Sequence, residues 1–75
     1  MPRLPRISGK KAIRTLKNMG FEQVRQKGSH VILKKMTYSG EVGCVVPLHK
    51  ELSPGTLRGI LRQANVTVDD FLKNL

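Results

Sequence analysis

Apolar residues near the N-terminus recur every three or four positions, the spacing of one face of an α-helix. The pattern predicts a helix over residues 8–19, with apolar positions at Ala12, Ile13, Leu16 and Met19. Ser8 is suited to cap the first turn of this helix. Gly20 supplies the left-handed residue that commonly follows a helix.

The middle of the chain consists of short runs rich in Val and Ile, separated by turn residues. These runs predict three strands, at residues 21–26, 30–36 and 41–46. They are joined at Gly28 and at residues 37–40, and strands joined by such short turns pair antiparallel.

The second predicted strand has two faces of different character. Val31 and Leu33 lie on one face. The opposite face carries His30, Ile32 and Lys34. The alternation alone leaves open which of these faces the helices cover.

Helical spacing returns in the last third of the chain. Ser53 and Pro54 open a helix as N-cap and first-turn proline, with apolar positions at Leu57, Ile60, Leu61 and Ala64. Thr67 begins a short final helix, with apolar positions at Val68, Phe71, Leu72 and Leu75. The order α-β-β-β-α-α predicts one α+β domain over residues 1–75, with a three-stranded antiparallel sheet and helices packed on one face.

The N-terminus and the cysteine content set the expected compartment. Residues 1–7 are expected to form a loose arm, because Pro2 and Pro5 disfavour helix. No apolar run follows them as in a signal peptide, and none approaches the ~20 residues of a membrane-spanning helix. Cys44 is the only cysteine, which fits a reducing compartment, so we expect a cytoplasmic protein.

The charge of the chain changes the range of partners to consider. Fourteen Lys and Arg stand against five Asp and Glu, a formal charge of +9. Such an excess attracts polyanions, and nucleic acid is the first of these to consider. A domain this small hides only about 60% of the surface of its unfolded chain. A polymer gripped on the outside therefore suits it better than a cofactor held inside, and no cofactor is expected.

Most types of catalytic site are excluded by elimination. The soft ligands His30, Cys44 and His49 match no common zinc spacing, so no metal site is expected. No phosphate-binding glycine loop precedes a helix. What remains is the segment from Lys27 to His30, a histidine after a Gly-Ser turn among basic residues.

His30 is the candidate general acid–base residue. An imidazole, with an unperturbed pKa of about 6.5, transfers protons near neutral pH. RNA brings its own nucleophile, the 2′-hydroxyl, so cleavage needs only a base, positive charge and alignment. The candidate RNA-binding residues are Lys10, Arg14, Lys17, Arg25, Lys27, Gly28, Ser29 and Lys34. An isolated histidine beside such a turn is also a common structural residue, and the role of His49 stays open.

Three parts of the chain carry a family resemblance. They are residues 21–30, which end in Gly28-Ser29-His30, residues 46–64, which contain Val46-Pro47-Leu48-His49 and Gly55-Thr56-Leu57, and residues 68–71. At these distances they make the chain similar to the HicA-type mRNA interferase toxins, from about Leu4 to Leu72. Many members carry a second histidine or an aromatic residue directly after the first, where this chain has Val31.

The resemblance implies a fold like that of double-stranded-RNA-binding domains. It also implies endonucleolytic cleavage of mRNA without a metal, by the histidine that corresponds to His30, and neutralisation by a HicB-type antitoxin. Two alternatives remain. One is an RNA-binding module without catalysis, in which His30 contacts a phosphate or a base. The other is an interaction protein whose positive surface matches an acidic partner.

Overall fold

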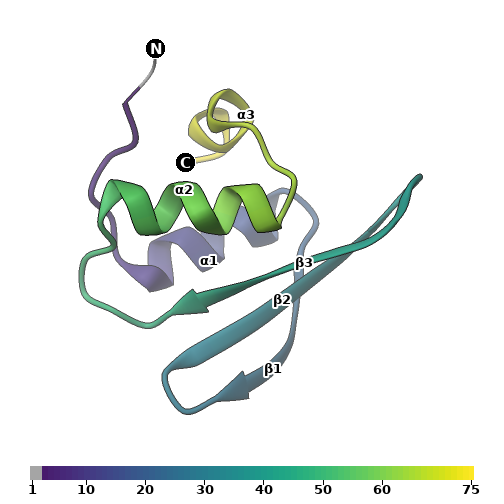
Figure 1. Ribbon diagram of the computed structural model, residues 1–75, viewed down its shortest axis with the longest axis horizontal. Coiled ribbons are helices and arrows are strands. Elements are labelled where there is room, and N and C mark those ends of the chain that lie inside the picture. Colours follow the sequence, from purple (N-terminus) through teal and green to yellow (C-terminus); the bar gives the residue numbers. More distant parts are fainter. Residues whose placement is uncertain (1–2) are drawn as a thin grey trace.

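The computed structural model describes residues 3–75 as an α+β fold (Figure 1). Its elements are α1 (Gly9–Asn18), β1 (Glu22–Lys27), β2 (His30–Thr37), β3 (Gly40–Pro47), α2 (Pro54–Gln63) and α3 (Val68–Lys73). The strands form one antiparallel sheet in the order β1-β2-β3. The predicted fold class and element order are confirmed, and each strand boundary shifts by a single residue at most. None of the described helices is long and apolar enough to cross a membrane.

The helices begin at side-chain caps, as the sequence predicts. The side chains of Ser8, Ser53 and Thr67 each accept a hydrogen bond from the backbone N–H three residues on, at 3.0, 3.2 and 3.1 Å. The first helix ends at Asn18 with Met19 as its C-cap, and Gly20 follows with a φ of 100°. Local sequence therefore fixes where these helices start and where α1 stops.

Helices α1 and α2 both pack against β3 on one face of the sheet, the residues of β1 stay exposed, and α3 packs against α2 (Figure 1). Under the helices lie Val31 and Leu33 of β2, which are 2% and 0% exposed. This decides the question that the alternation left open. His30, Ile32 and Lys34 lie on the uncovered face of the sheet, which we call the open face.

The expectation of a loose arm over residues 1–7 is wrong for the part of it that is described. Leu4 and Ile7 are buried in the core, and Ile7 forms a β-bridge with Leu52. The N–H of Leu52 donates to the Ile7 carbonyl at 2.6 Å. Proline disfavours helix but not an extended segment, so the chain packs here without forming a helix. Residues 1–2 lie outside the described residues.

Truncation of the N-terminal anchor tests this packing. We expect Ile7→Ala to lower the free energy of unfolding by about 2 kcal/mol or more, because it leaves a cavity in the core. The control is Arg3→Ala, which alters an exposed side chain of the same segment and should change stability by less than about 0.5 kcal/mol. Urea denaturation measures both values. Equal, small changes in the two variants would show that the segment is not anchored.

Candidate functional site

His30 is the first residue of β2, and its side chain is exposed on the open face of the sheet. In the strand register it stands opposite Lys27 of β1 and Pro47 of β3. Residues directly opposite each other point to the same face, with Cβ atoms about 4.5–5.5 Å apart. The imidazole and the Lys27 side chain therefore share one exposed surface.

A two-residue turn, Gly28 and Ser29, delivers His30 to this position. Gly28 has a φ of 60°, whereas Ser29 has a negative φ, the pattern of a type II′ hairpin turn. The side-chain amide of Gln26 donates to the Gly28 carbonyl at 3.1 Å and braces the turn. A Cβ on Gly28 would meet nothing within 4 Å. Glycine is thus required by the backbone angle, and the space above the turn is open.

Backbone hydrogen bonds join this turn to two segments that are distant in sequence. The N–H of Leu48 donates to the Ser29 carbonyl at 2.7 Å, and the N–H of Gly9 donates to the His49 carbonyl at 2.9 Å. Gly9 lies so close to β3 that a Cβ there would overlap the Pro47 carbonyl oxygen. The β1–β2 turn, the loop after β3 and the start of α1 consequently form one end of the molecule, which we call the histidine end.

His49 lies at the histidine end as well. Its exposed side chain lines a shallow cleft of about 340 Å³ together with Ser8, Lys10, Leu48 and Lys50. Sequence reasoning left His49 without a role and did not single out Lys50. In the sequence, only the place of His49 in the family-like segment indicated this region. The contact between the His49 loop and α1 joins segments that are distant in sequence, so the sequence could not show it.

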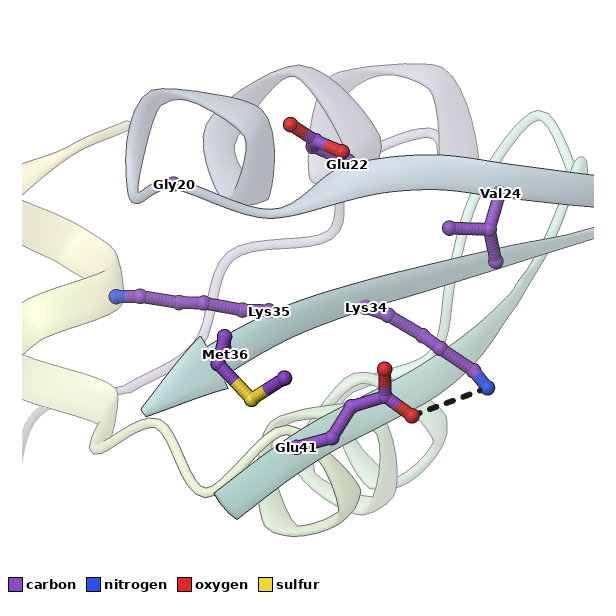
Figure 2. A pocket seen from close by; sticks show the side chains of 7 residues that line it. All are labelled: Gly20, Glu22, Val24, Lys34, Lys35, Met36 and Glu41. Atoms are coloured by element: carbon purple, nitrogen blue, oxygen red, sulfur yellow. Dashed lines mark ion pairs between the residues drawn. The ribbon is translucent and has the colours of Figure 1, made fainter. Parts of the chain in front are cut away.

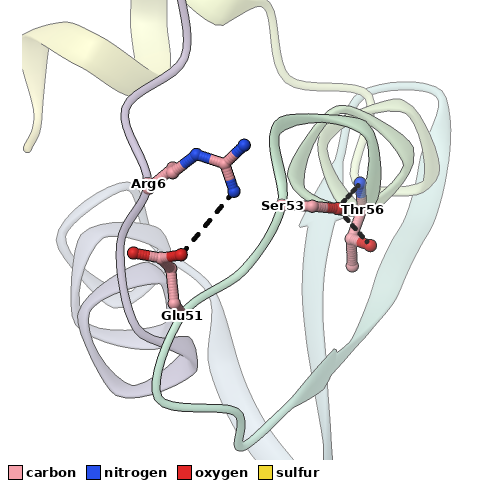
Figure 3. A network of polar contacts seen from close by, with 4 residues as sticks. All are labelled: Arg6, Glu51, Ser53 and Thr56. Atoms are coloured by element: carbon pink, nitrogen blue, oxygen red, sulfur yellow. Dashed lines mark hydrogen bonds and ion pairs between the residues drawn. The ribbon is translucent and has the colours of Figure 1, made fainter.

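The loop that carries His49 is tied at its far side. Arg6 lies 3.6 Å from Glu51, the loop's only carboxylate, in a largely exposed ion pair of small energetic weight (Figure 3). Next along the chain, the Ser53 hydroxyl accepts a hydrogen bond from the Thr56 N–H at 3.2 Å and donates one to Oγ1 of Thr56 at 2.9 Å. The single negative charge of this loop is therefore offset locally by Arg6.

Most of the predicted RNA-binding residues lie on or next to the histidine end. Lys27 stands opposite His30, and Arg25 stands opposite Ile32, the next open-face position of β2. Lys10 lines the cleft with His49, and two exposed residues of α1 follow it, Arg14 and Lys17. At 1.5 Å per residue, Lys17 lies about 10 Å further along the helix than Lys10.

Lys34 is not brought to His30. It lies four residues along β2, about 13 Å away, and its Nζ is 3.2 Å from Oε1 of Glu41 (Figure 2). Together they line a hollow at the opposite end of the hairpin. The structure therefore places Lys34 away from His30, and the ion pair with Glu41 partly neutralises its charge.

The described residues offer little other reactive chemistry. Within residues 3–75, no three His, Cys, Asp or Glu side chains gather where they could hold a metal ion. Burial of Cys44 raises the pKa of its thiol to about 11. The thiol is protonated at neutral pH and points into the core, so it is no candidate nucleophile.

Comparison with protein families decides the class of the chain. A family model described as the HicA toxin of bacterial toxin–antitoxin matches residues 9–66, from the first residue of α1 to just beyond α2. The chain belongs to the HicA toxin family. The matched part of this HicA chain contains the β1–β2 turn and both histidines. Searches of curated proteins and of solved structures gave no match.

The departure of this HicA chain at Val31 is explained by its fold. Val31 is 2% exposed and packs under the helices, on the side of β2 opposite to His30. A residue at this position faces the core in this chain. A valine at this position therefore does not change the exposed surface that carries His30.

A pair of glycine substitutions tests the contact that joins α1 to the loop of His49. We expect Gly9→Ala to lower the free energy of unfolding by about 1–3 kcal/mol, because the new methyl group has to displace the Pro47 backbone. Gly55→Ala, in α2 with open space around it, should instead raise stability by up to about 1 kcal/mol. Thermal or urea unfolding measures the sign of the stability change in both variants. A harmless Gly9→Ala would mean that α1 and the loop are not in contact.

Proposed function

We propose that this chain is an endoribonuclease toxin that cleaves mRNA without a metal and is neutralised by a HicB-type antitoxin. His30 is its general acid–base residue. The observation that carries the proposal is the exposed imidazole of His30 beside Lys27 on the open face. A ring under the helices could not reach a ribose. Family membership supports the toxin role, and an mRNA substrate would place the activity in the cytoplasm.

The chemistry requires few groups because RNA contains its own nucleophile. His30 accepts the proton of a 2′-hydroxyl while the 2′-oxygen attacks the adjacent phosphorus. The bond from phosphorus to the 5′-oxygen breaks as the new bond forms, leaving a 2′,3′-cyclic phosphate on one product. The leaving 5′-oxygen gains a proton from solvent. The Lys27 ammonium offsets the charge that builds up on the phosphate oxygens.

The proposed RNA path starts at the histidine end and continues onto α1. Gly28 and Ser29 let a phosphate approach the turn, where Gly28 leaves open space and the Ser29 hydroxyl is exposed. The basic residues proposed to follow the backbone are Lys10, Arg14, Lys17, Arg25 and Lys27. Lys34 is the weakest member of the predicted set, since Glu41 already balances its charge.

Removal of the imidazole tests the catalytic role. We expect His30→Ala to slow RNA cleavage by about 10²–10⁴-fold, the usual contribution of a positioned acid–base group, and His30→Gln to do the same. Cleavage by the unaltered chain should persist in EDTA. Circular dichroism serves as the control for folding, and a filter assay as the control for RNA binding. Wild-type rates in His30→Ala would refute the mechanism, and binding without product even in the unaltered chain would favour the RNA-binding module.

Removal of a single cation tests the path of the RNA. Lys27→Ala should weaken RNA binding at low salt and lower the slope of log K against log salt by about 0.7, the value for one single-strand phosphate contact. The matched control is Arg62→Ala, which removes an exposed cation in the last turn of α2 and should leave the slope unchanged. Equal losses in both variants would indicate attraction by net charge alone.

A further inference from the structure

Apolar side chains are exposed in the middle of β1, near the end of β2 and in the β2–β3 turn. Met36 is 72% exposed, Val24 is 53% exposed and Tyr38, at the tip of the β2–β3 hairpin, is fully exposed. Val24 and Met36 line one hollow of about 410 Å³, and Met36 and Tyr38 line the next. Single exposed apolar residues are ordinary, but a group of them marks an interaction site. We call these three residues the hairpin patch.

The backbone beside the patch is an open sheet edge. The turn that joins β2 to β3 has two residues, so its closing pair, Thr37 and Gly40, exchanges hydrogen bonds. The neighbouring residue, Met36, therefore directs its N–H and C=O to the β1 side. On that side the pairing ends at Glu22 with Lys34, because the chain turns away there toward α1. The hairpin runs on past the helices (Figure 1).

The charges that line the hollow between Val24 and Met36 cancel, unlike those of the rest of the chain. Lys34 is paired with Glu41 at 3.2 Å, and the Lys35 Nζ donates to the Met19 carbonyl at 2.8 Å. Glu22 and Glu41 line the same hollow as both lysines (Figure 2). Two carboxylates thus balance two ammonium groups in a chain of net charge +9. A polyanion gains little by binding here, whereas a protein surface with apolar and mixed polar groups fits.

We propose that an extended segment of the antitoxin adds as a strand along the free edge of β2 at residues 35–37. Its side chains would cover Val24, Met36 and Tyr38. Strand addition supplies backbone hydrogen bonds to an open edge and lets alternate side chains enter neighbouring hollows. The antitoxin is the chosen occupant because the family supplies a protein partner, and the charges disfavour RNA. The proposal rests on the antitoxin part of the proposed function and does not require cleavage by His30.

The patch would anchor the antitoxin at a distance from the proposed catalytic residue. Met36 and His30 lie on the same strand and the same face, about 20 Å apart. A partner held at Met36 can extend over the open face toward His30. Loss of the anchor and loss of catalysis are therefore separable by mutation.

Substitutions in the patch test the anchor. Met36→Glu and Tyr38→Ala are each expected to raise the Kd for the purified antitoxin by about tenfold or more, the scale of a central interface residue. The control is Leu75→Glu, which alters another exposed apolar side chain and should leave the Kd unchanged. RNA cleavage by the isolated variants should equal that of the unaltered chain. If neither the unaltered chain nor any variant cleaves RNA, circular dichroism takes the place of cleavage as the control for folding. The antitoxin titration still tests the anchor.

Hydrogen exchange tests the strand pairing itself. The Met36 amide should exchange rapidly in the free toxin and at least about tenfold more slowly in the complex, because it would then be hydrogen-bonded. An unprotected Met36 amide in the complex overturns strand addition. An unchanged Kd in both patch variants overturns the anchor. If the patch variants bind the antitoxin normally but lose affinity for RNA, the patch is an RNA contact and the proposal is overturned. If they bind the antitoxin normally but the free toxin no longer self-associates, the patch is a contact between two copies and the proposal is likewise overturned.

Discussion

In the three-stranded sheet, Val31 and Leu33 of β2 pack under α1 and α2 and are almost completely excluded from solvent. A domain this small has room for one core, so only one sheet face can be buried. Because side chains alternate along a strand, this burial sends His30 and Met36 to the open face. One packing choice therefore makes both the proposed catalytic group and the hairpin patch accessible.

The open face differs in character from one end to the other. At the histidine end, Lys27 stands beside the imidazole and Lys10 lies in the adjoining cleft. At the far end, the pairing of Lys34 with Glu41 leaves a balanced surface with exposed apolar groups. Under the proposed function, the toxin engages RNA and also an inhibitory protein. The uneven charge along one strand offers each of these partners a surface of its own.

Local sequence determined the elements and the leading candidate residue. The caps Ser8, Ser53 and Thr67 fixed the helix starts because capping depends on residues three positions apart. Short turns fixed the antiparallel strands. The Gly-Ser turn before His30 could be proposed as a catalytic site because the turn and the histidine are adjacent in the chain, and the resemblance to HicA toxins pointed to the same residue.

Tertiary packing decided what depends on segments that are distant in sequence. It buried Ile7 against Leu52, which the prolines of the N-terminal segment could not reveal. It brought His49 to the start of α1, paired Lys34 with Glu41, and chose the sheet face that the helices cover. The alternation of a strand defines two faces but not which one is buried. That choice is made only when helices dock on the sheet, because burial depends on contacts between elements.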